Sequence, residues 1–323
     1  MFTLALPLLI GWLSPGWSQD ALRSGSVIAY SFAPLILAGL LISLFTAQLV
    51  RRDVRSPPLF EAMPGAAVLI AVLAAGQPTV WPLIIGTVSG LTIQCIGLGW
   101  MAWRNGAIVA PRFRFSSPNW APFLSSAGVI VIGQLLASVV FPIDQLIAAR
   151  LGEGVVAQFG YASRLLALAN AVFAIAVTRA LLPTLSRLGD ADLRRALTRR
   201  WTQLLFLCGT VLAVVIWIFS KEIVELLFQR GAFSAADTVA VSGILRAAAF
   251  QIPVYLASIV LIQLLTSEQR LATITLIAAA GTLVKIPASL LLADSYGPAG
   301  IMWATAAMYT LVFVLLTLVL RRR

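Results

Sequence analysis

The sequence predicts an all-α protein, a polytopic bundle of helices that cross a membrane. Of its 323 residues 60% are hydrophobic and only 11% are charged, whereas soluble globular chains carry roughly 25% charged residues. The mean hydropathy is +0.96. Long apolar runs recur along the chain, separated by Gly, Pro or charged residues. Because the backbone must satisfy its own hydrogen bonds inside lipid, runs of this length indicate transmembrane helices.

Nine runs approach the roughly 20 apolar residues that a transmembrane helix requires. A shorter run, MFTLALPLLIGWLSPGW, precedes them. It lacks the basic start and the small-residue cleavage site of a signal peptide, so we interpret it as the remnant of a transmembrane helix. The fourth and fifth of the nine runs exceed the bilayer thickness and are expected to tilt or to project into water. The nine runs cover residues 28–50, 60–77, 80–103, 119–150, 155–186, 199–220, 239–266, 270–293 and 297–320.

The basic residues gather in alternate loops between these runs. One set of loops holds most of the 23 basic residues, and by the positive-inside rule that side faces the cytoplasm. The C-terminus is then cytoplasmic, and residues 226–238 lie on the outer side. The first set consists of Arg51, Arg52, Arg55, Arg104, Arg112, Arg114, Arg187, Arg194, Arg195, Arg199, Arg200, Arg270 and Arg321 to Arg323, and the second of Arg23, Arg150, Lys221 and Arg230.

The composition disfavours several classes of function. The chain has no His, and Cys95 and Cys208 lie inside apolar runs, so no disulfide framework, metal site or cofactor is predicted. The net charge of +11 could suggest a nucleic-acid partner, but the basic residues follow the loops instead of clustering on a folded surface. No GxxxxGK[ST] loop occurs, so we expect neither ATP hydrolysis nor another enzymatic activity.

The stretch LLFQRGAFSAADT, residues 226–238, places a glycine and polar residues in an otherwise apolar chain. Gly231 suits a left-handed or closely packed position, and Phe233 is expected to hold the turn against its neighbours. Ser234 is predicted to cap the following helix, with Asp237 completing a short-armed capping box. We favour this interpretation as a capped turn over direct contact with a substrate.

Four charged residues stand out deep inside the apolar runs, where a charge needs a partner or a water-filled cavity. They are Asp144, Arg164, Arg246 and Lys285. A fifth, Arg179, lies about two turns from the cytoplasmic end and can extend to the headgroups. Asp144 follows Pro142 in the middle of residues 119–150, and a proline there frees a backbone carbonyl one turn earlier. Transporters place ion sites at such breaks near the membrane midplane.

Three stretches together resemble one family. They are IDQLIAARLGEGVVAQFGYASRLLAL (143–168), RALLPTLSR (179–187) and LLFQRGAFSAADT. They resemble the MurJ (MviN) lipid II flippases of the multidrug/oligosaccharidyl-lipid/polysaccharide exporter superfamily, in the family's order and near its spacing. The resemblance extends from residue 15 to residue 320. It implies two pseudo-symmetric lobes of six helices each, of which this chain would lack the first two to three helices and any helices after the twelfth.

On this basis residues 1–117 form an incomplete first lobe of four helices, the first of them truncated, and residues 118–323 form a second lobe of six helices. An internal repeat supports two lobes independently. Residues 15–48 and 230–269 share a Gly followed by an aromatic and an acidic residue, then Phe and Pro at the head of an apolar helix, then a polar Thr and Gln exit. Many transporters build two halves around a central site from such repeats.

The resemblance also implies that Arg164 faces a central cavity and meets the diphosphate of a lipid-linked sugar. A guanidinium stays charged in a low dielectric and offers a planar fork to phosphate oxygens. The family often carries an acid and a Pro shortly after this Arg, whereas this chain has Ala167 and Ala169. A structural role, in which Arg164 pairs with helix ends or extends to the headgroups, stays open.

Two further arginines have alternative interpretations. Arg246 could line the opposite wall of the cavity, or it could pair with Asp237 or Glu225 at the outer edge. Arg230 could pair with the same two acidic residues, although pairs at a surface are usually weak.

In some relatives a sodium ion is held by an acid, two polar side chains four residues apart, a carbonyl and a Thr. The positions that resemble this set are Asp144, Lys285, Ser289, Ile301 and Thr305. An ammonium 4 Å from a sodium ion would be repelled by about 4 kcal/mol at an effective dielectric near 20. We therefore predict that Lys285 replaces the ion and pairs with Asp144. The alternative is that Lys285 extends to the headgroups and Asp144 bonds Gln134 or Gln145.

The resemblance implies a flippase that moves a polyprenyl-diphosphate-linked peptidoglycan precursor, lipid II, to the outer leaflet of the bacterial inner membrane by alternating access. The lipid-linked oligosaccharide and membrane lipids are the expected partners, with cell-wall synthesis proteins as further candidates. Three alternatives stay open: export of another polyprenyl-linked glycan, a truncated and inactive family member that serves as a scaffold, and a drug or cation antiporter. Arg164 disfavours the last, because it would repel a cationic drug.

Overall fold

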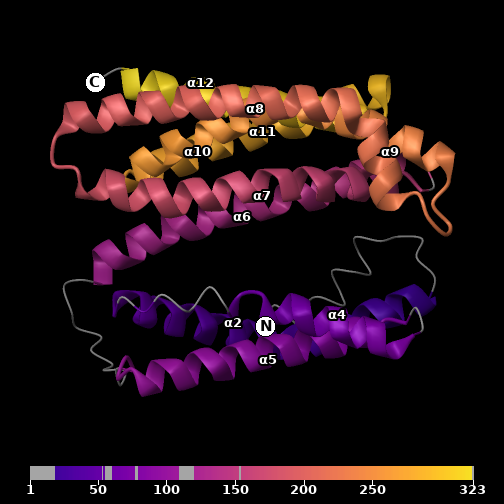
Figure 1. The fold of residues 1–323 in the computed structure, drawn as a ribbon, viewed down its shortest axis with the longest axis horizontal. Coiled ribbons are helices and arrows are strands. Elements are labelled where there is room, and N and C mark those ends of the chain that lie inside the picture. Colours follow the sequence, from indigo (N-terminus) through magenta and orange to yellow (C-terminus); the bar gives the residue numbers. More distant parts are fainter. Residues whose placement is uncertain are drawn as a thin grey trace. The chain divides into compact units, whose positions relative to one another are not determined.

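The structure is a computed structural model, and it describes residues 19–52, 54, 60–76, 79–108, 120–152 and 154–321. Every regular element in these ranges is an α-helix (Figure 1). The chain divides into two compact units, residues 1–114 and residues 115–323. The opening run that we interpreted as a helix remnant lies outside the described residues.

The first unit contains α2 (Gln19–Arg51), α4 (Met63–Ala75) and α5 (Trp81–Arg104), and α5 packs against both of the others. A small core around Leu49 and Leu98 joins α2 to α5. The expectation of a full span over residues 60–77 is wrong, because α4 has only 13 residues. Such a helix measures roughly 20 Å, against a hydrocarbon thickness of about 30 Å. Pro64 at its start and Gly76, with a left-handed φ of 61°, at its end confine it.

Two glycines one helical turn apart bring α4 and α5 into close contact. A Cβ added to Gly86 would lie 2.5 Å from Val68 Cα, and one added to Gly90 would lie 2.5 Å from Pro64 Cα. The spacing Gly-x-x-x-Gly lets helix backbones approach each other in lipid. This motif is visible in the sequence and was not among the features from which we predicted the fold.

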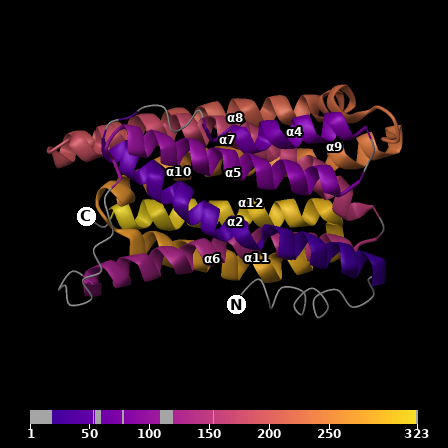
Figure 2. The same ribbon diagram turned by 90° about the horizontal axis from the view of Figure 1, so that it is seen from below.

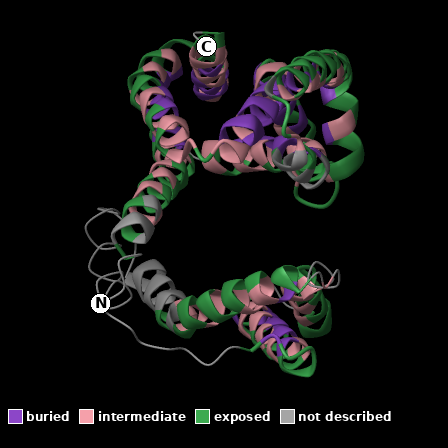
Figure 3. Ribbon diagram, turned by 90° about the vertical axis from the view of Figure 1, so that its left-hand side faces the viewer, coloured by how far each residue is buried: buried purple, intermediate pink, exposed green. Residues whose placement is uncertain are grey.

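The second unit contains seven described helices. α10 packs against both α7 and α8 (Figure 1), and α11 packs against both α6 and α12 (Figure 2). Buried residues gather where these helices face one another (Figure 3). The elements are α6 (Trp120–Arg150), α7 (Val155–Arg187), α8 (Ala191–Phe228), α9 (Ala235–Ala249), α10 (Ile252–Ser267), α11 (Leu271–Tyr296) and α12 (Pro298–Arg321).

The single span expected over residues 239–266 is broken into α9 and α10, which meet at an angle of 44°. Pro253 in the first turn of α10 explains the position of the break. A proline ring clashes with the carbonyl four residues earlier, and that residue is Ala249, where α9 ends.

The helix expected over residues 199–220 extends much further, from Ala191 to Phe228. The Asp190 side chain caps its start by accepting hydrogen bonds from the backbone of Asp192 and Leu193. Phe219 departs from helical geometry, with φ −97° and ψ 16°, so the helix is kinked there. Within the described residues, seven helices are long and apolar enough to span a membrane, or eight if α9 and α10 form one span, instead of the nine expected. The protein is thus a multi-pass membrane protein.

Candidate functional site

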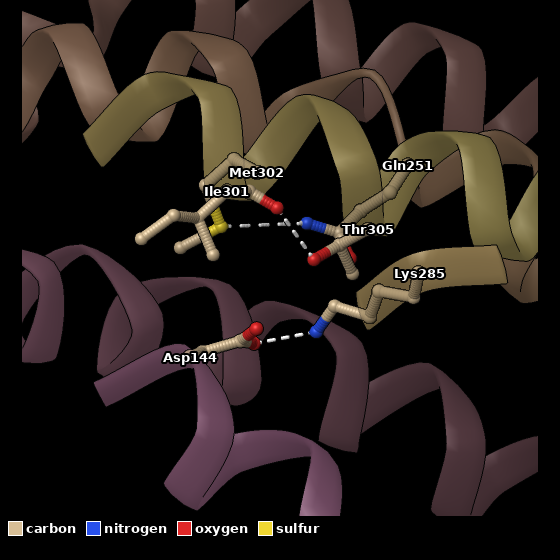
Figure 4. Close-up of polar contacts among 6 residues, drawn as sticks. All are labelled: Asp144, Gln251, Lys285, Ile301, Met302 and Thr305. Carbon is tan, nitrogen blue, oxygen red and sulfur yellow. Dashed lines mark hydrogen bonds and ion pairs between the residues drawn. The ribbon is translucent and has the colours of Figure 1, made fainter. Parts of the chain in front are cut away.

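An ion pair lies inside the second unit, between α6 and α11. Lys285 Nζ is 2.5 Å from Asp144 Oδ2, and the two side chains are 3% and 8% exposed (Figure 4). The structure therefore brings together the two residues for which the sequence suggested pairing. Asp144 forms this bond in place of one to Gln134 or Gln145.

Local sequence places both charges beside a weakened stretch of helix. Pro142 lies within α6 two residues before Asp144, and Pro287 lies within α11 two residues after Lys285. Each proline removes one backbone hydrogen bond of its helix. The two helices also meet further along, where Thr275 Oγ1 donates to the Val129 carbonyl at 3.3 Å.

Energetically the pair is costly to disturb. Two charges withdrawn from water tolerate burial only when they neutralise each other, and removing one partner typically costs about 3–5 kcal/mol. The arrangement is net neutral, so it can exist inside a membrane without a further counter-ion.

A cavity of about 400 Å³ adjoins the pair. Polar side chains from α6, α7, α10, α11 and α12 share its wall with apolar ones. Asn170 contributes a carbonyl oxygen with no hydrogen-bond partner among the described residues, and the rings of Tyr255 and Tyr309 meet edge to face at 5.0 Å. The polar lining consists of Asp144, Ser163, Asn170, Gln251, Tyr255, Lys285, Thr305 and Tyr309.

Of the five positions that resemble a sodium site, Asp144, Lys285 and Thr305 line this cavity. Thr305 Oγ1 donates a hydrogen bond to the Ile301 carbonyl at 2.9 Å, so these two groups of the set are hydrogen-bonded to each other (Figure 4). Ser289 is fully buried and its Oγ has no partner in the described part of the chain. With the ammonium beside the carboxylate, the cavity offers a cation no unpaired negative charge.

Arg164 lies on α7 with its side chain exposed, and it is not part of the cavity wall, although the neighbouring Ser163 and Ala167 are. Arg246 on α9 is also exposed, and its Nε donates to Ser220 Oγ at 2.7 Å. Ser220 is fully buried next to the kink of α8. Arg246 therefore bonds Ser220, and neither Asp237 nor Glu225 pairs with it among the described contacts.

The turn at residues 230–237 has the capped geometry that the sequence predicted. The Ser234 side chain accepts from the Asp237 backbone at 3.2 Å, and Asp237 Oδ2 accepts from the Ser234 backbone at 3.0 Å, which completes the capping box. Gly231 has a φ of 63°. Phe233 packs edge to face on Tyr161 with the ring centroids 5.2 Å apart.

The pairing suggested for Arg230 is wrong. Its guanidinium donates to the Leu227 carbonyl at 2.7 Å, and no ion pair with Asp237 or Glu225 occurs in the described residues. Asp237 instead accepts a hydrogen bond from Gln158 of α7 at 3.3 Å. Gln158 was missed by sequence reasoning, as were Asn170 and Gln251. The available signal was an amide side chain inside an apolar run.

Comparisons with known proteins agree on one family. The family model described as lipid II flippase MurJ matches residues 1–323. A probable lipid II flippase MurJ of Rhizobium meliloti is 28% identical over 272 residues, which cover 78% of this chain and 49% of that protein. The corresponding protein of Rhizobium tropici is 27% identical over 274 residues, covering 78% of this chain and 50% of that protein. The chain thus spans about half the length of these curated relatives.

Solved structures agree on the fold. Lipid II flippase MurJ in an inward closed conformation has a TM-score of 0.78 at 19% identity, over 99% of this chain and 70% of that one. A Vibrio cholerae MATE transporter, VcmN, has a TM-score of 0.70 at 17% identity, over 100% of this chain and 76% of that one. With the family model matching its whole length, the chain belongs to the lipid II flippase MurJ family.

Proposed function

We propose that this protein moves a polyprenyl-diphosphate-linked peptidoglycan precursor, lipid II, from the cytoplasmic to the outer leaflet of a bacterial inner membrane. The family match over residues 1–323 carries the proposal, and the multi-pass fold is consistent with it. The polar head of such a lipid cannot cross hydrocarbon unaided, whereas its polyprenyl tail never has to leave it. Alternating access resolves this, because a rigid-body movement exposes the same site to each side in turn.

Arg164 is the residue that we assign to the diphosphate. Its guanidinium is exposed and forms no hydrogen bond or ion pair with any described residue, so its donors are available. Arg246 is a second candidate, because only its Nε is bonded, to Ser220. A guanidinium fork stays charged and matches phosphate oxygens in two parallel hydrogen bonds.

In this proposal the Asp144–Lys285 pair supplies a fixed connection between α6 and α11 and takes the place of a bound cation. The precursor is made in the cytoplasm, and the basic loops with the C-terminus are assigned to that side. Cell-wall synthesis proteins that deliver or consume the precursor are candidate partners.

Rescue of a bacterium depleted of its own lipid II flippase tests the proposal. We expect this chain, or a naturally longer form of it, to restore growth and the appearance of lipid II in the outer leaflet. Arg164→Ala should abolish rescue at equal membrane abundance, and Arg150→Ala, which removes another exposed arginine of the second unit, should not. Export of a different polyprenyl-linked glycan in the absence of lipid II translocation would contradict the proposal.

A further inference from the structure

A second cavity, of about 440 Å³, lies among α8, α10 and α12 of the second unit. None of its lining residues belongs to the cavity beside Asp144 and Lys285. It sits where α8 begins and where α10 and α12 end. This is the end of the unit that carries the basic loops, and we call it the basic-end pocket.

Three arginines line the basic-end pocket. Arg195 and Arg199 lie one turn apart on α8, and Arg321 is the last residue of α12. Arg199 and Arg321 form no ion pair or hydrogen bond with a described residue, and Arg195 is 3.9 Å from the exposed Asp192. Like charges one turn apart repel each other. A bound anion would reduce this repulsion.

Among the described residues, the one acidic side chain in the lining does not neutralise these arginines. Glu268 forms no ion pair with the three described arginines of the lining; its Oε2 lies 3.9 Å from Nη1 of Arg270, which is outside the lining. Part of the wall is apolar: Leu261 and Leu264 are buried, and Phe313 is half-buried.

The three threonines of the wall have their hydroxyl groups bonded within their own helices. Thr198, Thr202 and Thr317 each donate the hydroxyl to a carbonyl of their own helix, at 2.8 Å in all three cases. Their hydroxyl protons are therefore used, and the donors left for a ligand are the guanidinium groups and the Gln203 amide. A cationic rim above an apolar wall fits a molecule with a phosphate at one end and hydrocarbon at the other.

The geometry points to a binding site for the phosphodiester of an anionic membrane phospholipid in the basic-end pocket. Arg199 and Arg321 hold the phosphate, and the glycerol and upper acyl carbons lie against Leu264 and Phe313. Basic residues near the ends of spans meet the layer of lipid phosphates, and guanidinium forks bind phosphate in two parallel bonds. The excess of positive charge favours an anionic headgroup over a zwitterionic one. This site does not depend on the proposed transport function.

The test compares lipids retained by the purified protein, measured by native mass spectrometry and by thermal melting with added lipid. The probes are dioleoyl phosphatidylglycerol, dioleoyl phosphatidylcholine and the soluble glycerol 3-phosphate. We expect phosphatidylglycerol to be retained preferentially and to raise the melting temperature. The double variant Arg199→Gln/Arg321→Gln should weaken phosphatidylglycerol binding roughly tenfold, as loss of charge-assisted hydrogen bonds implies.

The matched control is Arg150→Gln/Arg200→Gln, which removes the same charge from exposed positions outside the pocket. Equal weakening in the control would show a general surface-charge effect and would overturn the proposal. So would equal retention of the two phospholipids, or equal protection by glycerol 3-phosphate, which has no acyl chains. If the double variant fails to fold, the single variant Arg321→Gln, in the last turn of α12, provides the same comparison.

Discussion

Lys285 and Asp144 form an ion pair that joins α11 to α6, with both side chains more than nine-tenths withdrawn from solvent. We expect Lys285→Ala to lower the free energy of unfolding by about 3–5 kcal/mol, because the carboxylate would remain buried and unpaired. Thermal melting in detergent measures this. Adding Asp144→Ala should recover part of the loss, and a double variant no more stable than the single one would rule out the pairing as the cause.

The same pair predicts the response to sodium. The parent protein should melt at the same temperature in sodium chloride and in choline chloride of equal ionic strength, because the Lys285 ammonium already neutralises Asp144. Lys285→Asn removes that ammonium and leaves the Asp144 carboxylate unpaired, while Ser289, one turn further along α11, has a hydroxyl without a partner among the described residues. Sodium should then stabilise the variant relative to choline. A sodium-dependent parent would contradict the prediction.

Arg164 should matter for transport and not for stability. Since its exposed guanidinium has no partner among the described residues, Arg164→Ala should change the free energy of unfolding by less than about 0.5 kcal/mol. Arg164→Lys should keep part of the activity, because it preserves the charge and loses the fork. Lipid II translocation and melting temperature, measured on the same preparations, separate the two effects. A large drop in melting temperature would indicate a structural role instead.

The closely packed glycines of α5 predict that alanine substitution lowers the stability of the protein at these positions and not at an open glycine. Gly86→Ala would place a methyl group 2.5 Å from Val68 Cα, so α4 and α5 must separate, at a cost of about 1–3 kcal/mol. Gly39→Ala on α2 is the control, since nothing lies within 4 Å of its added Cβ, and alanine there should favour the helix slightly. Hydrogen exchange of α4 should rise in the first variant alone.

Loss of the helix cap before α9 is expected to lower the stability by less than loss of the ion pair does. Ser234→Ala removes the side-chain acceptor for the Asp237 backbone and should cost roughly 1 kcal/mol. Ser234→Thr retains a hydroxyl that can accept from the Asp237 backbone and donate to its carboxylate, and it should melt close to the parent. Comparable losses in both variants would mean that the cap contributes little.

Hydropathy and charge cost predicted much of this molecule from its sequence. The long apolar runs correspond to the long helices. The expense of a lone charge in lipid marked Asp144 and Lys285 as residues that need partners, and the resemblance to a sodium site in some relatives is why the two were expected to meet. The breaks were harder, although Pro64 and Pro253 signal them, because hydropathy averages over single residues. The partners of Gln158 and Arg246 depend on which helix faces pack together, and that relationship is not encoded in local spacing.

The neutrality of the Lys285–Asp144 pair has an electrical consequence. Moving one elementary charge through a potential of 100 mV involves about 2.3 kcal/mol of work, but opposite charges that travel together contribute equal and opposite amounts. If α6 and α11 shift as one body along the membrane normal, the voltage exerts no net force on them through this pair. Any voltage dependence of the protein then originates at other charged groups.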